Sequence, residues 1–231
     1  MSRSGVSKPR MGRPSLVDRE AIVNAAVEIG FDRLTMSAVG SLLGVRHSTL
    51  YRYFATRDAL AAAAIDRCVD SVPWPEPEGD WREFLRATAR SYWSLYERHA
   101  GLAVEVSALR TISAALVDIA NRSGVVLLDL GFDAEDAVLV IDMLGELVTQ
   151  AFLGAAAASP QAPATTEEPD DVGVVDGSRR RREQLLRPWL DHYDVRLRDV
   201  LAEVIARPPV EQFEKKLEIF LDGVGRRAGD R

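Results

Sequence analysis

The sequence predicts an all-α protein in which a small N-terminal domain of short helices precedes a larger domain of longer helices. Three observations predict this class. Apolar residues recur every three or four positions along most of the 231 residues, whereas no alternating apolar–polar segment exceeds a few residues. Gly30 and Gly44 end short apolar segments, and Pro73, Pro75 and Pro77 separate these from the longer segments that follow.

The first residues predict a flexible arm and one helix. Residues 1–14 are polar and basic and contain Pro and Gly, so we expect no regular structure there. Apolar positions at helical spacing predict a helix over residues 15–29. Asp18 or Ser15 caps its start, and Gly30 ends it.

Three further helices complete the N-terminal domain, which we expect over residues 15–72. Thr35 begins a short helix that ends before Gly44, and a second short helix spans about 46–54. Thr56 caps the next helix, which runs to about residue 72. The side chains expected to face the core of this domain are Val39, Leu42, Leu43, Leu50 and Phe54.

A linker over residues 73–79 leads to the larger domain, residues 80–231. A stretch at about 159–182 is rich in Pro, Asp and Gly and poor in bulky apolar side chains, so we expect a mobile loop. The run Arg179–Arg182 is either a nucleic-acid patch or a solvated helix start beside acidic residues, and we favour the second. The helices expected in this domain span about residues 80–99, 101–108, 111–129, 133–157, 187–206 and 209–226.

Composition excludes several classes of protein. The sequence is 47% hydrophobic and 28% charged, as is ordinary for a globular protein. No secretory signal and no apolar run of about 18 residues is evident, so we expect no membrane association. The single cysteine, Cys68, excludes an internal disulfide and suits the reducing cytoplasm, where we expect it as a small buried side chain. One thiol and three scattered histidines provide no metal site, and we expect no cofactor.

Charge is distributed unevenly along the chain. Residues 1–57 carry nine Lys and Arg against four acids, a net charge of +5. The other 174 residues carry 20 basic and 31 acidic side chains, a net charge of −11. Because charges act on DNA phosphates within a Debye length of about 10 Å, the N-terminal domain is the part suited to DNA.

Residues 35–57 carry the strongest functional signal. Gly40 allows two short helices to cross closely, and Gly44 allows the positive φ that the turn between them needs. Once the apolar residues are buried, the second helix presents hydrogen-bonding side chains and no acid, as a surface that reads base edges and phosphates requires. These side chains are Arg46, His47, Ser48, Thr49, Tyr51, Arg52 and Tyr53.

Leu43–Leu60 reads Leu-Gly-Val-x-x-x-Thr-Leu-Tyr-x-Tyr-Phe-x-x, followed by a basic residue, an acidic residue and Ala-Leu. This phrase, with Gly-Arg-Pro-Ser at residues 12–15, resembles the DNA-binding domain of TetR-family repressors over residues 15–72. The resemblance implies that Arg46, His47 and Ser48 face bases in the major groove of double-stranded operator DNA. It further implies that phosphates are held by Thr35, Ser37, Thr49, Tyr51, Tyr53 and Arg57, with Tyr53 partly in the core as the alternative.

The remainder resembles the tetracycline-repressor-like C-terminal class more loosely, through Leu130–Asp136 and the terminal helix. In that class two long helices of each subunit form a four-helix bundle in a homodimer. Apolar stripes on the helices at 133–157 and 209–226 fit either this dimer or an internal core. The residues expected at the dimer interface are Ile141, Leu144, Val148, Phe152, Phe213, Leu217, Phe220 and Val224.

A small, largely apolar effector is expected in the larger domain, because aromatic side chains with a few polar groups are typical of ligand pockets. The candidate lining residues are Tyr92, Trp93, Tyr96, His99, Glu105 and Arg110, with Trp81, Trp93 and Tyr96 in the core as the alternative. The helix at 56–72 joins the two domains, and its motion is the route of signal transmission that the resemblance implies.

Rival functions are weighed on the same residues. We expect no enzyme, because no catalytic triad order, phosphate loop or metal motif occurs, and Asp66, Glu97 and Glu105 are isolated acids. A non-specific architectural DNA protein would need dispersed positive charge. The sequence leaves open a regulator of the same fold that needs no ligand, or that activates transcription, beside the expected ligand-released repressor.

Overall fold

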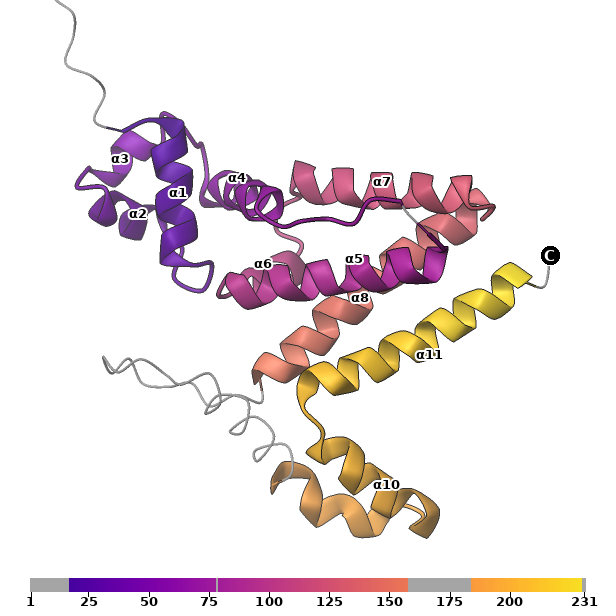
Figure 1. Ribbon diagram of the computed structural model, residues 1–231. Helices are drawn as coiled ribbons and strands as arrows, with labels where there is room; N and C mark the ends of the chain where they lie inside the picture. The colour runs from indigo at the N-terminus through magenta and orange to yellow at the C-terminus, as the bar shows by residue number, and fades with distance from the viewer. Residues whose placement is uncertain (1–16, 78, 158–183, 230–231) are drawn as a thin grey trace, which may run out of the picture.

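The computed structural model describes residues 17–77, 79–157 and 184–229. Every regular element in these ranges is a helix, which confirms the predicted fold class. Figure 1 shows three short helices gathered at one end, the longer helices beside them, and a C-terminal hairpin that projects from the body. The arm at 1–14, the loop at about 159–182 and Arg179–Arg182 lie outside the described residues.

The N-terminal helices begin and end near the predicted signals. They are α1 (Arg19–Ile29), α2 (Met36–Leu42), α3 (His47–Leu50) and α4 (Arg57–Asp70). Asp18 caps α1, since its carboxylate accepts a 2.8 Å hydrogen bond from the Ala21 amide, while Thr35 and Thr56 cap α2 and α4 in the same way. The helix expected over 46–54 is shorter than predicted, because the chain continues as turns over residues 51–53.

Helix α4 belongs to both parts of the molecule. It packs against α1 on one side and against α7 (Ala114–Asp129) on the other. Its buried face includes Cys68, whose side chain is 1% exposed, and this burial raises the pKa of the thiol to about 12. The prediction of a small buried cysteine is confirmed.

The body of the larger domain is built around α8 (Ala134–Ala157), which contacts α5 (Trp81–Arg98), α6 (Leu102–Ser107), α7 and the terminal helix α11 (Pro209–Gly229). Contrary to the expectation from sequence, Ala134–Ala156 is long and apolar enough to cross a membrane by length and composition alone. Four other helices contact it, but only 28% of this apolar window is buried, so its inner face belongs to the core of the bundle and much of its outer face stays exposed.

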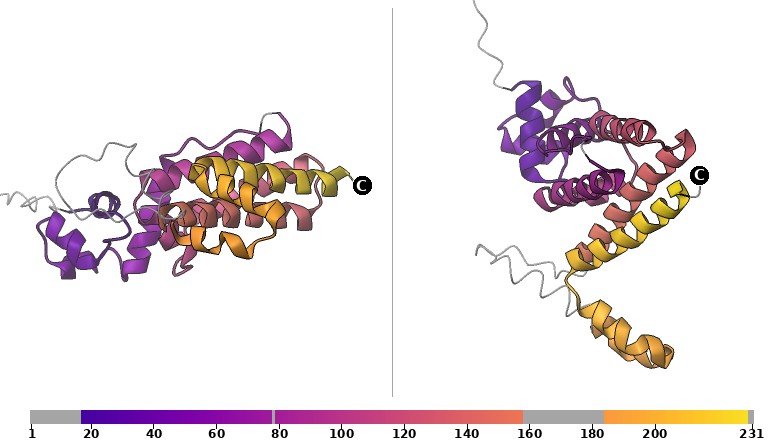
Figure 2. Two further views of the ribbon diagram at one scale, coloured as in Figure 1. Left: turned by 90° about the horizontal axis from the view of Figure 1, so that it is seen from below. Right: turned by 45° about the vertical axis from the view of Figure 1, so that its right-hand side comes forward.

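The C-terminal region corrects one predicted helix. In place of one helix over 187–206, the chain forms a 3-10 helix η1 (Arg187–His192) and then α10 (Val195–Ala206). Asp194 interrupts the run, because its carboxylate accepts a 2.9 Å hydrogen bond from the Arg196 amide and caps α10. Helix α11 then returns beside α8, as both views in Figure 2 show.

Candidate DNA-binding surface, domain junction and effector pocket

Two glycines shape the helix-turn-helix as the sequence predicts. A Cβ atom on Gly40 would lie 2.9 Å from the Val45 carbonyl oxygen and 3.2 Å from the His47 amide nitrogen, so only glycine lets α2 approach α3 this closely. Gly44 has a φ of +66°, in the left-handed region that favours glycine. Both predicted roles are confirmed.

The core beneath α3 is small. Val39, Leu50 and Phe54 are fully buried, as expected. Leu43 is half-buried and packs against the same core. Leu42 was expected inside but is 48% exposed, because α2 is only two turns long and its last residue lies beyond the reach of α3 and α1.

The surface of α2 and α3 leaves most of the predicted DNA-contacting side chains accessible. Ser37, Arg46, His47, Ser48 and Tyr51 are exposed, whereas Thr49 is half-buried and the Thr35 hydroxyl accepts the cap hydrogen bond. The Arg46 side chain makes no cap hydrogen bond. The rings of His47 and Tyr51 meet edge to face at 6.3 Å.

Tyr53 makes hydrogen bonds within the domain. Its hydroxyl donates to the Val17 carbonyl at 2.9 Å, and its own carbonyl accepts a 3.0 Å hydrogen bond from the Arg19 guanidinium. The Arg19 guanidinium also lies 4.2 Å from the centroid of the Phe54 ring. Tyr53 is half-buried and fixes the start of α1 against the end of the recognition segment, which fits the alternative that it lies partly in the core.

Arg57 is also used inside the molecule. Its guanidinium makes a bidentate ion pair with the Glu105 carboxylate of α6, one arm of it at 2.7 Å, and donates to the Leu34 carbonyl at 3.3 Å. The hydrogen bonds to Glu105 raise the pKa of Arg57 above its ordinary value. Arg57 and Glu105 therefore neutralise one another at the boundary between the domains, and Glu105 is not among the residues that line the cavity.

Two further contacts complete this boundary, which we call the domain junction. The Phe31 amide donates to the Ala100 carbonyl at 2.9 Å, where Gly101, with a φ of +77°, lies against the backbone of Asp32. The carboxylate of Asp66, on α4, accepts hydrogen bonds from the hydroxyl of Ser113 at 2.6 Å and the amide of Ala115 at 3.0 Å. Helix α4 is therefore tied to α6 at its start and to α7 near its end.

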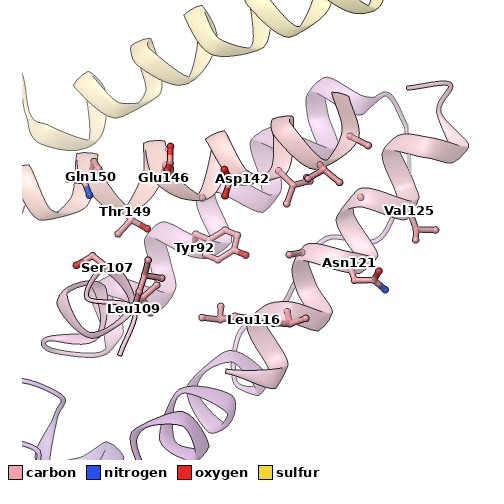
Figure 3. A pocket seen from close by; sticks show the side chains of 18 of the residues that line it. Tyr92, Ser107, Leu109, Leu116, Asn121, Val125, Asp142, Glu146, Thr149 and Gln150 are labelled. Carbon is pink, nitrogen blue, oxygen red and sulfur yellow. The ribbon is translucent and has the colours of Figure 1, made fainter. Parts of the chain in front are cut away.

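A cavity of about 730 Å³ lies between α5, α6, α7 and α8. Figure 3 shows α7 and α8 forming opposite walls, with side chains of both directed into the space between them. Tyr92 and Tyr96 line it, as predicted, and the Tyr96 hydroxyl forms a 2.8 Å hydrogen bond with that of Thr149. Most other lining residues are aliphatic, which suits a largely apolar molecule.

The other candidate lining residues lie elsewhere. Trp93 is in the core, stacked on Phe213 with ring centroids 4.7 Å apart, as the alternative reading expected. His99 is half-buried at the end of α5, where burial lowers its pKa, and it does not line the cavity. Arg110 is exposed in the loop before α7.

Sequence reasoning missed several polar lining residues. Asp142, Glu146 and Gln150 follow one another along α8 at intervals of four, and Asn121 lies opposite on α7. Their spacing could have revealed them, because three polar residues at intervals of four lie on one face of a helix. A polar face on a largely apolar helix indicates a surface that is not buried in the core.

The predicted dimer stripe forms the inside of the subunit. Leu144, Val148, Phe213 and Leu217 are at most 1% exposed, because α11 and α5 cover them against α8. Val224 is also buried, and Ile141, Phe152 and Phe220 are half-buried against the same core. Leu144, Val148, Phe213 and Leu217 therefore fit the internal-core alternative, whereas Phe220 and Val224 also line the groove between α8 and α11.

Other apolar residues remain available to a second copy. A groove of about 340 Å³ runs between α8 and α11, with Leu139 and Met143 on one side and Ile219 on the other, each at least 44% exposed. The hairpin of η1 and α10 also exposes large apolar side chains in this chain. These are Leu185, Trp189, Val195, Leu197 and Val200.

Comparisons with known proteins agree with this geometry. A model for bacterial regulatory proteins of the tetR family matches residues 19–64, and one for the tetracyclin repressor-like C-terminal domain matches residues 72–227. The tetracycline repressor class A from transposon 1721 of Escherichia coli is 28% identical over 93% of this chain and 91% of its own length. The HTH-type transcriptional repressor Rv1353c of Mycobacterium tuberculosis is 27% identical over 91% of this chain and 81% of its own.

Among solved structures, ActR of Streptomyces coelicolor in complex with actinorhodin has the same fold, with a TM-score of 0.73 and 23% identity over 92% of this chain and 99% of that one. The fold and the surface of α2 and α3 define a helix-turn-helix transcriptional regulator. Because the C-terminal model covers more than half of the residues, the chain belongs to the TetR family of DNA-binding transcriptional regulators. This family consists of regulators, which confirms that the chain is not an enzyme.

Proposed function

We propose that the protein is a homodimeric repressor that leaves a near-palindromic operator when a small, largely apolar molecule occupies the cavity. The Arg57–Glu105 ion pair carries this proposal. Glu105 lies on α6 directly before Val106 and Ser107, which line the cavity. A ligand that displaces α6 therefore acts on the start of α4, and through it on the helix-turn-helix.

The residues assigned to DNA are exposed on or beside α2 and α3, except for Thr49, which is half-buried. Arg46, His47 and Ser48 contact base edges, and Arg46 is the candidate for a bidentate contact with guanine. Tyr51 and Thr49 hold phosphates, together with the Thr35 and Ser37 hydroxyls at the start of α2. Tyr53 and Arg57 act indirectly, because they fix the position of the recognition segment.

The dimer is proposed to form over the groove between α8 and α11 and over the exposed hairpin. A contiguous apolar surface of this kind on one subunit is typical of an interface. Two-fold symmetry would place two recognition helices about 34–36 Å apart, which matches successive major grooves. This arrangement uses the groove between α8 and α11, which Phe220 and Val224 of the predicted stripe also line.

Release follows from differential binding. A ligand shifts the repressor from DNA only if it binds the non-DNA geometry more tightly, and a shift from 1:99 to 99:1 needs a difference of about 10⁴-fold in affinity. The domain junction offers the means, since a displacement of α6 or α7 would break the hydrogen bonds that join them to α4 and to the residues after α1. We place the protein in the cytoplasm, where operator DNA is present and a free thiol stays reduced.

Selection of bound sequences from a random DNA pool tests the proposal. Purified protein should enrich a two-fold symmetric site, and sedimentation should show one dimer per site. Enrichment of an asymmetric site, or of none, would contradict it. Compounds that stabilise the protein thermally, with minocycline and actinorhodin included because relatives were crystallised with them, are then tested for release of that site. If no compound that binds the cavity releases DNA, the result would contradict a ligand-released repressor and favour a regulator that needs no ligand.

A further inference from the structure

We propose that the effector of this pocket is an organic cation, with an apolar, ring-containing body and a protonated amine. The inference rests on the proposed effector role of the cavity and specifies its ligand. The choice of an organic cation rests on the charge of the residues that line the cavity. Apolar walls can bind many kinds of molecule, whereas the few polar groups determine which of them bind best.

The charged side chains that line the cavity are all acidic. Asp142 and Glu146 lie one turn apart on α8, and no Lys, Arg or His is among the described residues that line the cavity. Neither carboxylate makes an ion pair within the described ranges of the chain. Both side chains are exposed, so they line the open part of the cavity. Like charges one turn apart repel one another, so a cation bound beside them relieves that repulsion.

Tyr92 is a second, independent indication of a ligand. Figure 3 shows its hydroxyl directed into the space between α7 and α8. Unlike the Tyr96 hydroxyl, which is bonded to Thr149, that of Tyr92 has no hydrogen-bond partner in the part of the chain that the structure describes. Burial raises the pKa of Tyr92, so the group stays neutral and can accept a hydrogen bond from an ammonium group.

Size and shape fit the same class of molecule. The cavity of about 730 Å³ is large enough for a body of several fused rings, and aliphatic residues of α7 and α8 such as Leu116 and Val125 form much of its wall. An anion of the same shape would be repelled by Asp142 and Glu146, and a neutral analogue would gain nothing from them.

Three probes with one body and different charge test this inference in the absence of DNA. They are 1-pyrenemethylammonium, 1-pyrenemethanol and 1-pyrenecarboxylate, titrated into the full-length protein and followed by pyrene fluorescence. We expect the cation to bind roughly tenfold or more tightly than the carboxylate, with the alcohol between them. The double variant Asp142→Asn/Glu146→Gln should lose most of this preference while still binding the alcohol.

A matched variant controls for net charge. Asp118→Asn/Glu135→Gln removes two exposed carboxylates of α7 and α8 that do not line the cavity, and it should keep the preference for the cation. The inference is overturned if the carboxylate binds as tightly as the cation, if the cation binds both double variants equally, or if no probe binds. Release of operator is measured separately, so a cation preference without release contradicts only the proposed function.

Discussion

The two ends of the molecule are built from contacts of different range. In the helix-turn-helix, Gly40 lies against Val45 and His47, which are at most seven positions away, and Thr35 caps α2 through the amide three positions on. In the larger domain, α11 is held to α5 by pairs such as Arg86 with Glu218, which are 132 positions apart. The helix-turn-helix is therefore shaped largely by contacts between residues close together in the sequence. The larger domain depends on packing between segments that are far apart in the sequence.

The largest effect expected is on the local part. Gly40→Val places a branched side chain against the Val45 carbonyl and should force α3 away from α2, at a cost of about 1–3 kcal/mol. Operator affinity should fall at least about 100-fold, because the recognition residues lose their register. Gel shift measures the affinity, and circular dichroism should show the helical content of the larger domain unchanged. The control Gly154→Ala, where a Cβ meets nothing within 4 Å, should bind DNA normally.

The domain junction comes next. Arg57→Gln leaves Glu105, which is 3% exposed, without its cation and should destabilise the protein by about 1–3 kcal/mol. Arg52→Gln removes an exposed guanidinium at a neighbouring position and should change stability little. A double-mutant cycle with Glu105→Gln, followed by urea unfolding, isolates the pair. Additive single effects would show that the two side chains are not coupled and would remove the proposed link between pocket and α4.

A smaller effect separates base reading from phosphate binding. Arg46→Ala should cost about 1–3 kcal/mol of discrimination at one base pair of each half-site. Tyr51→Phe should weaken binding to all sequences similarly, because a phosphate contact carries no base information. Titration against operators mutated one position at a time distinguishes the two. If Arg46→Ala lowered the affinity for every mutated operator by the same factor, Arg46 would not be a base-reading residue.

The smallest effect concerns reactivity. With a pKa of about 12, the Cys68 thiol stays protonated at pH 8, and it is buried in α4. Iodoacetamide should therefore label the native protein far more slowly than a free cysteine peptide, and urea should restore the ordinary rate. Rapid labelling of the native protein would indicate that α4 opens away from α1 and α7 without ligand.

Expectations drawn from short-range patterns agree with the structure at particular residues. Asp18, Thr35 and Thr56 cap the helices expected of them, and Gly44 has the positive φ that its turn requires. Expectations that needed a distant partner failed. Glu105 was predicted to line the pocket. Its actual partner, Arg57, is 48 positions away, and no local sequence pattern connects the two residues.

The apolar stripes of α8 and α11 show the same limit. Their spacing predicted that Val148 and Phe213 are covered, and both are. Spacing cannot state whether the covering helix belongs to the same subunit, because a period of 3.6 residues is the same in both cases. Only the placement of α11 beside α8 assigns these residues to the internal core.

By itself, the sequence determined the fold class and the helix-turn-helix, because caps, turn glycines and helical periodicity act within one or two turns. Only the tertiary structure showed which polar side chains are available to contact DNA or a ligand. Tyr53 and Arg57 have partners inside the subunit, while Asp142, Glu146 and Tyr92 face a cavity without one in the described chain. The physical reason is that availability depends on neighbours brought together by long-range packing, which residue type and spacing do not record.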